Sequence, residues 1–574
     1  MYIRRINRKK DGKDHFYWAL VESRRTTRGP RQHTVAYLGE MDKAGRIGVK
    51  LAAENRRGHQ SDLFDTTKPK WVEVNIRAVR TERTRDFGEI WLALELLKRL
   101  GLYDFFHQIM PKKRERIPWA DLVCVLIISR FCNPKSELYI AEHFYGHTAL
   151  ADLIGIPNNK VYDNRLYRAL DKLLPHKETL ERHLKERFGI LFNIKYDLLL
   201  YDVTSTYFEG MAKNNPQAKR GYSRDKRPDC KQVCIALVVT KEGIPLGYEV
   251  FDGNRKDVTT LKEIIEKMEK RYGATDRIWV LDRGMISAKN IEFLKHRRYI
   301  IGTPKSMLKN FEKELFSEDW QTVQEGLKVK YCSSPFGDDE TFIICQSTAK
   351  EEKERAILER FTENIELGLE KINLACEKGR LKNIGVAERR IGRLLQRNTR
   401  AAGLFDIKVT KDDQDKLTLH WTQRQERQQW NKLSMGYYLL RSNIKDWSAE
   451  ELWRAYVHLT DAEEAFRIQK SDLILRPIWH QKPERVQAHI LVCFLTFVLW
   501  KCLSQMCKHN GLGNEPRKVI DEIKRIKLTD VILPTRNGVE IKLSCVTQPA
   551  PHQKVLLQRL GLNIPTRLTK NYKM

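Results

Sequence analysis

The spacing of apolar positions changes along the chain and predicts a strand-rich segment between two helical ones. Short apolar runs between residues 196 and 304 are typical of strands, and Lys241, Glu242 and Gly243 predict a tight turn between two of them. The predicted strands are 196–203, 233–240, 244–251, 277–282 and 299–303, and the predicted helices are 257–272 and 287–297. This order, three strands and then helix, strand, helix, strand, indicates an α/β fold with a mixed sheet flanked by helices.

Apolar residues recur with helical spacing on both sides of this segment. Helices are expected over 87–102, where Gly101 marks the end, within 118–190, and over 351–377, 389–400, 448–470 and 484–507. Ser448 is the expected N-cap of its helix, with Glu450 and Glu451 in the first turn. Further strands are expected at 416–421 and 437–441, and residues 489–500 are too short an apolar run to span a membrane, so a buried core helix is expected there.

The first 85 residues carry 21 Lys and Arg against 10 Asp and Glu. Residues 16–21 and 33–38 predict two strands joined by a basic turn, and 40–70 is polar and irregular. The predicted domains are a basic N-terminal region (1–85), a helical domain (86–190), the first part of the α/β core (191–304), an inserted domain (305–435), the second part of the core (436–510) and a C-terminal region with possible dimer or DNA contacts (511–574).

Charge and cysteine usage narrow the class of protein. The chain of 574 residues has a net charge of +30, which favours a polyanionic partner such as nucleic acid. Its 11 cysteines are scattered and several lie in apolar runs, so a reducing compartment is expected instead of a disulfide framework. The first 13 residues lack the apolar stretch of a secretory signal.

Two aspartates follow apolar strands. Asp202 lies in YDVTSTYFEG and Asp282 in VLDRG, each at the predicted end of its strand. Ligands gather at the carboxyl ends of strands in α/β sheets, although an aspartate there often only caps a turn. If the two strands are neighbours, two facing carboxylates need a cation between them, and a hard divalent ion such as Mg²⁺ is the expected one.

A third acid lies in the helix YVHLTDAEEAFRIQK. Tyr456, Glu463 and Lys470 are spaced by seven, so in an unbroken helix they share one stripe, and Arg467 joins it. Such a stripe could bind metal through the acid and phosphate through the cations, or it could be an ordinary charged surface. Glu464 points away from this stripe and is the weaker candidate.

These motifs, taken in order, resemble the DDE transposases of bacterial insertion sequences, in the subgroup with a Y-x2-R-x3-E-x6-K signature. Tyr456, Glu463 and Lys470 fit that spacing, whereas Leu459 replaces the arginine. The segment SDLILRPIWH (471–480) is also similar to the family's sequence after the third acid. The resemblance is best over 196–304 and 436–500, and it implies a ribonuclease H-like fold with an insertion domain over 305–435, before the last catalytic helix.

The resemblance implies DNA cleavage at the element ends and strand transfer into target DNA by a DDE transposase. It implies that Asp202, Asp282 and Glu463 hold two ions, Mg²⁺ or Mn²⁺, and that Tyr456, Arg467 and Lys470 contact DNA. Double-stranded DNA is the expected partner, bound by a homodimer. The basic N-terminal region is expected to read the terminal repeats. The helix 389–400 either adds phosphate contacts or is simply a solvated basic helix. The protein is expected in the bacterial cytoplasm, at the nucleoid, and away from membranes.

Two other functions remain open from the sequence. A nuclease or resolvase on the same fold would cut DNA without joining strands. A transposase-derived DNA-binding protein would keep the fold and the charge but lose catalysis; the presence of all three acids argues against it.

Overall fold

The computed structural model describes residues 2–10, 13–26, 29–39, 72–112, 114–273, 276–337, 339–411 and 416–568. Within them the chain forms two compact units. One, here the discontinuous unit, comprises Met1–Arg277 and His458–Met574; the other, the central unit, is Ile278–Val457. The expectation for 40–70 lies outside the described residues.

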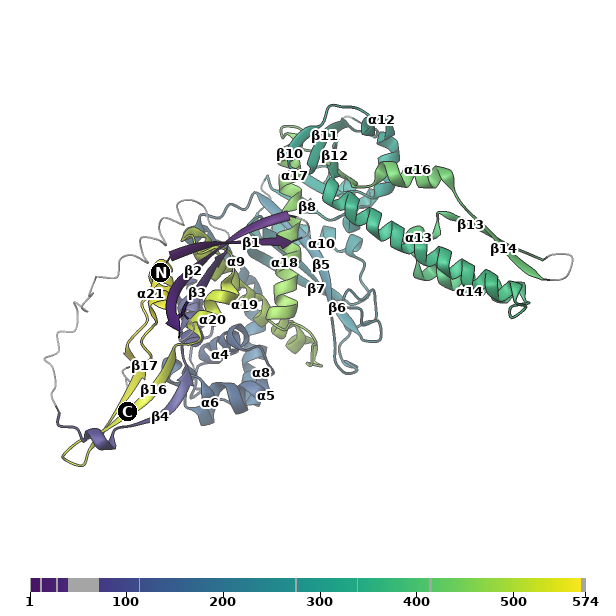
Figure 1. The fold of residues 1–574 in the computed structure, drawn as a ribbon. Coiled ribbons are helices and arrows are strands. Elements are labelled where there is room, and N and C mark those ends of the chain that lie inside the picture. The colour runs from purple at the N-terminus through teal and green to yellow at the C-terminus, as the bar shows by residue number, and fades with distance from the viewer. Residues whose placement is uncertain are drawn as a thin grey trace. The chain divides into compact units, whose positions relative to one another are not determined.

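The discontinuous unit contains the first three predicted strands. β5 (Leu198–Tyr207), β6 (Gln232–Thr240) and β7 (Pro245–Asp252) form an antiparallel meander (Figure 1). Every residue of β6 is buried, as expected for a strand covered on both faces. Gly243 adopts φ 71° in the turn between β6 and β7, a left-handed conformation that glycine adopts without steric cost. The amphipathic helix α10 (Leu261–Tyr272) follows.

The same unit also contains a group of helices that pack against one another. α19 (Pro483–His509) packs against α2 (Gly88–Arg99), α4 (Trp119–Cys132) and α8 (Asp163–Leu173). α19 is long and apolar enough to cross a membrane, but its most apolar stretch is wholly buried within the protein. The expected core helix around residues 489–500 is therefore confirmed.

Two small sheets complete the described part of the discontinuous unit. The expected N-terminal hairpin is present as β2 (Lys13–Thr26) and β3 (Gly29–Gly39), and β1 (Tyr2–Lys10), which the sequence analysis missed, pairs with β2. The second sheet joins β4 (Arg80–Asp86) to β16 (Lys527–Pro534), β17 (Glu540–Val546) and β18 (Arg567–Leu568). The C-terminal region is thus tied by strand pairing to residues before the helical domain.

The central unit is built on a mixed sheet. β8 (Ile278–Leu281) and β9 (Arg298–Gly302) are parallel, and α11 (Ala288–Leu294) connects them. β15 (Tyr437–Ser442) pairs antiparallel with β9, and β12 (Thr341–Ser347), β11 (Leu327–Ser333) and β10 (Gln321–Gln324) continue the sheet in that order. The expected mixed sheet with flanking helices is confirmed.

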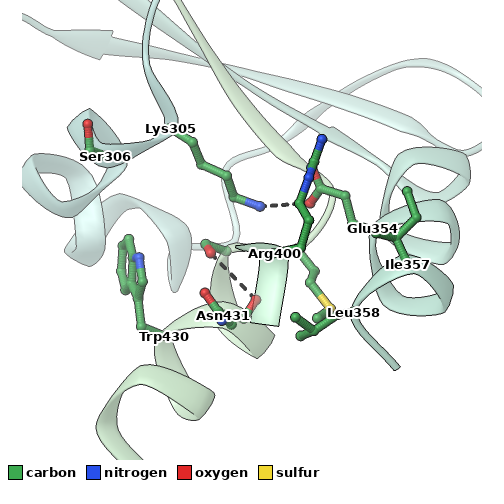
Figure 2. A pocket seen from close by; sticks show the side chains of 10 residues that line it. Lys305, Ser306, Glu354, Ile357, Leu358, Arg400, Trp430 and Asn431 are labelled. Carbon is green, nitrogen blue, oxygen red and sulfur yellow. Dashed lines mark hydrogen bonds and ion pairs between the residues drawn. The ribbon is translucent and has the colours of Figure 1, made fainter. Parts of the chain in front are cut away.

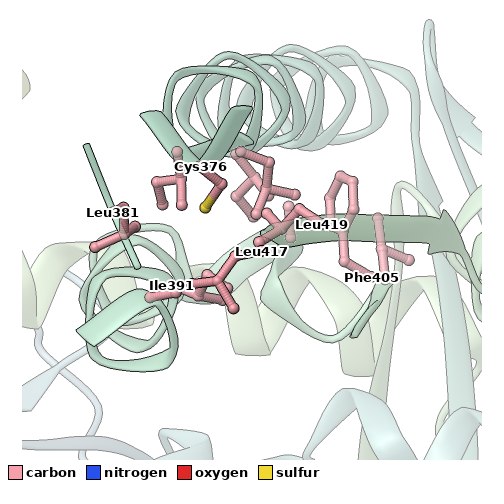
Figure 3. Packing of buried hydrophobic residues seen from close by; sticks show 12 residues of the cluster. Cys376, Leu381, Ile391, Phe405, Leu417 and Leu419 are labelled. Atoms are coloured by element: carbon pink, nitrogen blue, oxygen red, sulfur yellow. The ribbon is translucent and has the colours of Figure 1, made fainter. Parts of the chain in front are cut away.

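The segment predicted as an insertion, 305–435, is not uniform. Its first part supplies β10–β12 to the sheet of the central unit, which the sequence analysis did not foresee. The remainder comprises α13 (Thr348–Glu377), α14 (Ile384–Arg397), α15 (Thr399–Ala402), the hairpin of β13 (Phe405–Lys411) and β14 (Leu417–Gln423), and α16 (Gln425–Ser434). All of these elements except α16 contribute to a separate apolar core that includes Cys376, Ile391 and Leu419 (Figure 3).

A cavity of about 300 Å³ lies between this helical part and the turn η7 (Lys305–Phe311). Lys305 reaches toward Glu354 across it, with their charged atoms 2.7 Å apart, and Trp430 and Asn431 line the opposite wall (Figure 2). Arg400, from the segment 389–400 expected to offer phosphate contacts, lines this cavity, whereas none of the three predicted acids does.

The helix expected over 448–470 is interrupted. α17 (Ala449–Val457) and α18 (Leu459–Arg467) are separated by a turn at His458, and η8 (Ile468–Asp472) is a π-helical turn. Ser448 caps α17 as expected: its hydroxyl accepts from the Glu451 amide at 3.2 Å, and the Glu451 carboxylate accepts from the Ser448 amide at 2.8 Å. The prediction of one continuous helix is therefore wrong, because a turn and a π-helical segment interrupt it.

Candidate active site

Asp202 lies in the middle of β5, opposite Leu237 of β6. The expectation that Asp202 ends its strand is wrong, because the strand continues through the small hydroxyl residues to Tyr207. Among the neighbours of Asp202 along β5, Tyr201, Val203 and Thr204 are buried, whereas the carboxyl-bearing residue is half-buried. One of its oxygens accepts a hydrogen bond from the Val203 amide at 2.7 Å.

The segment around Arg224 brings positive charge to β5. The Arg224 amide donates to the Ser205 hydroxyl at 3.2 Å, and its guanidinium pairs with Asp257. Burial acts to lower the pKa of Arg224, but the hydrogen bond and charge of Asp257, with a smaller contribution from Asp202, raise it overall. Arg224 therefore remains a cation within electrostatic reach of Asp202. Arg224 is not among the predicted site residues, since an arginine in a polar loop gives no local signal.

Asp225 anchors two cations from the segment that follows α18. Its carboxylate is buried and accepts from Lys470 at 2.9 Å and from Arg476. Burial lowers the pKa of Lys470, and the hydrogen bond and charge of Asp225 oppose that effect. Lys470, predicted as a phosphate contact, is thus engaged in a buried ion pair in this structure. Arg476 belongs to the SDLILRPIWH segment, but the resemblance of that segment does not predict the contact of Arg476 with Asp225.

α18 carries the predicted third acid and packs against β5 and β6. Leu459, Ala462 and Phe466 form its buried face, whereas Glu463 is exposed. Arg467 is also exposed and lies 3.2 Å from Glu464. Asp202 and Glu463 are therefore carried by two elements of the discontinuous unit that pack directly together.

Asp282 lies in the central unit, immediately after β8. It is exposed and caps the short turn Arg283–Met285, accepting from the Gly284 amide at 3.4 Å. The capping role and a ligand role are compatible, because a carboxylate has lone pairs to spare after one amide contact.

Tyr456 approaches the backbone beside Asp282. A Cβ atom added to Gly302, at the end of β9, would lie 2.4 Å from the Tyr456 hydroxyl oxygen and 3.3 Å from the Arg283 amide nitrogen. A larger residue at this position would have to displace the Tyr456 hydroxyl. Two of the predicted site residues, Asp282 and Tyr456, thus lie on adjoining segments of the central unit.

Two stretches of the chain match known families. Residues 194–499, more than half of the chain, match the family model described as transposase DDE domain. Residues 3–62 match the model described as IS1634 family transposase, N-terminal domain. No curated protein matches the chain.

Proposed function

The chain belongs to the family of insertion-sequence DDE transposases and functions in DNA transposition, and from this premise we propose that Asp202, Asp282 and Glu463 are its metal-binding catalytic carboxylates. The observation that carries the proposal is the packing of α18, with Glu463, directly against β5, with Asp202. All three acids lie inside the matched range, and each is at least partly exposed.

The family implies a divalent metal, and the donor set fits one. Three carboxylates offer the hard oxygen ligands that Mg²⁺ and Mn²⁺ prefer, and two ions are proposed here. When bound, the ions would supply activation of the attacking hydroxyl and charge stabilisation at the leaving oxygen. Arg224 offsets part of the negative charge near Asp202, which limits repulsion among the acids.

The cations around the acids have different tasks in this proposal. Arg467 is exposed and could exchange its contact with Glu464 for a DNA phosphate. Lys470 pairs with the buried Asp225, so its first task is to hold the segment after α18, and a phosphate contact would have to share it. Tyr456 would orient the bound DNA strand near Asp282 through its hydroxyl. The Y-x2-R-x3-E-x6-K subgroup stays a prediction, because Leu459, which is buried in α18, stands where that signature has an arginine.

DNA is the partner that the family implies, and the finer contacts are proposals. The N-terminal region, 1–85, would read the terminal repeats, since it is strongly basic and its first 62 residues include an IS1634-type N-terminal domain match. Cutting two element ends together would require a dimer on DNA. Action on genomic DNA would place the protein at the nucleoid in the cytoplasm of a bacterium.

A strand-transfer assay tests the proposed reaction. The full-length protein is incubated with Mg²⁺, a labelled oligonucleotide duplex carrying one end of the element, and an unlabelled target plasmid. Transposition predicts that the label becomes covalently joined to the plasmid through the freed 3′-hydroxyl. Cleavage of the duplex without any joined product would favour the nuclease alternative and contradict the proposal.

A further inference from the structure

A second group of metal-ligating side chains is buried in the discontinuous unit, formed by Glu137, His480 and His489. One ligand atom from each lies within 4.8 Å of the other two. Glu137 begins the short helix α5 (Glu137–Tyr139), His480 follows the SDLILRP segment, and His489 lies in the second turn of α19. All three side chains are at least nine-tenths buried. None of them belongs to the carboxylate trio.

The distances are compatible with a shared ion. Nε2 of His480 lies 3.2 Å from Oε1 of Glu137. Two ligand atoms on a tetrahedral zinc ion, each about 2.0–2.1 Å from the metal, are about 3.3 Å apart. The same contact in a metal-free protein would be a hydrogen bond. The imidazole of His489, whose ring centroid lies 5.4 Å from that of His480, completes the group of three ligand-bearing side chains.

Further donors lie at the edge of the cluster. The carbonyl oxygen of Leu475 lies 3.3 Å from Nε2 of His489, and the sulfur of Cys493, one turn further along α19, lies 3.8 Å from the same nitrogen. A cation near the cluster, Arg130, donates to two carbonyl oxygens, those of Leu473 and Ile474, each at 3.1 Å. Its charge also reaches the cluster, where it lowers the pKa of Glu137 and of His489 and so favours the deprotonated forms that can bind a metal.

We propose that Glu137, His480 and His489 form a structural Zn²⁺ site, distinct from the carboxylate site. Two imidazoles and one carboxylate are a donor set that suits zinc better than Mg²⁺, which favours oxygen ligands. The ion would join three segments that are far apart in sequence: α5, the segment after η8 and α19. It would thereby hold the segment that also supplies Arg476 to Asp225.

The test separates this site from the proposed carboxylate site by removing the latter first. Full-length protein with Asp202→Asn and Asp282→Asn is stripped with a chelator, reloaded with Zn²⁺ alone, desalted and analysed for bound zinc by mass spectrometry. The proposal predicts one equivalent per chain. Adding His480→Gln should weaken Zn²⁺ binding by more than about 100-fold, because loss of even a supporting residue costs 10- to 100-fold. His143→Gln, which changes an exposed histidine, should leave the binding unchanged.

Two further measurements show whether a loss of zinc binding is caused by unfolding of the variant. Circular dichroism must show that the His480→Gln protein is folded, and Glu137→Gln, which retains the shape of the side chain, is measured in parallel. Zn²⁺ should raise the melting temperature of the Asp202→Asn, Asp282→Asn protein and should fail to do so in a folded Glu137→Gln or His480→Gln derivative. Less than 0.1 equivalent of zinc in the parent, or one equivalent retained by both folded derivatives, would overturn the proposal.

Discussion

Lys470 donates a hydrogen bond to Asp225 at 2.9 Å, and both side chains are at least nine-tenths buried. Arg476 shares the same carboxylate. A lysine that the sequence presents as a surface phosphate contact is thus part of a buried network beside the strand that carries Asp202. The network links a loop between β5 and β6 to the segment that follows α18.

Removing the charge of Asp225 should destabilise the protein. In Asp225→Asn, two buried or half-buried cations face a neutral amide, and breaking such a pair costs about 3–5 kcal/mol. Urea denaturation followed by fluorescence should show an earlier transition. Asp229→Asn removes an exposed carboxylate that pairs with Arg227, so it should shift the urea midpoint far less, because solvent screens an exposed ion pair. Equal midpoints for the two variants would contradict the assignment of a buried network.

Glu89 should make stability depend on pH. Burial, first, and the charge of Asp86 raise its pKa from 4.5 to about 7. Folding therefore retains a proton that the unfolded chain releases, so the contribution of Glu89 to stability is complete below pH 4.5 and is lost as pH rises to about 7. Glu89→Gln should leave stability unchanged near pH 4 and raise it by about 3 kcal/mol at pH 8.

Melting temperatures of both proteins between pH 4 and pH 8 check this expectation. Glu95→Gln, on the same helix but partly exposed beside Lys98, is measured in parallel as the matched control. A constant difference between Glu89→Gln and the unchanged protein over the whole pH range would disprove the raised pKa.

Ser448 should stabilise the start of α17. Its reciprocal hydrogen bonds with Glu451 satisfy two amides that a helix otherwise leaves unpaired. Ser448→Ala should cost about 1 kcal/mol, and Ser448→Asp, which retains a capping oxygen, should cost less. Limited proteolysis of the start of α17 provides the measurement; identical cleavage rates for the two variants would show that the cap has no energetic effect.

The sequence predicted the order of the strands and helices better than the interruptions within them. β5 to β9 and α19 were expected close to their actual positions because their apolar periodicity is strong. The break at His458 could not be predicted, since no glycine or proline marks it in the sequence. The break is slight, because His458 keeps nearly helical backbone angles, φ −60° and ψ −12°. The strand continuation from Asp202 to Tyr207 was missed because threonine and serine were interpreted as a strand end.

For the candidate site, the sequence suggests acids and cations by type and spacing but gives no signal for Arg224 or Asp225. Arg224 and Asp225 act through contacts with residues distant in the chain, Asp257 for the first and Lys470 for the second. The cluster of Glu137, His480 and His489 comes from three separate segments of the chain, so no local spacing in the sequence predicts it. Long-range packing, which periodicity does not encode, determines both groups.

Cleavage of an end-bearing DNA duplex in Mg²⁺ by a matched set of alanine variants tests the carboxylate assignment most directly. Asp202→Ala, Asp282→Ala and Glu463→Ala should each reduce cleavage by more than about 100-fold, while filter binding shows that DNA affinity is largely retained. Glu464→Ala, which removes the adjacent acid that pairs with Arg467, should cleave within a few-fold of the unchanged protein. Substantial Mg²⁺-dependent cleavage by Asp282→Ala, or loss of cleavage in Glu464→Ala with Glu463→Ala active, would contradict the assignment.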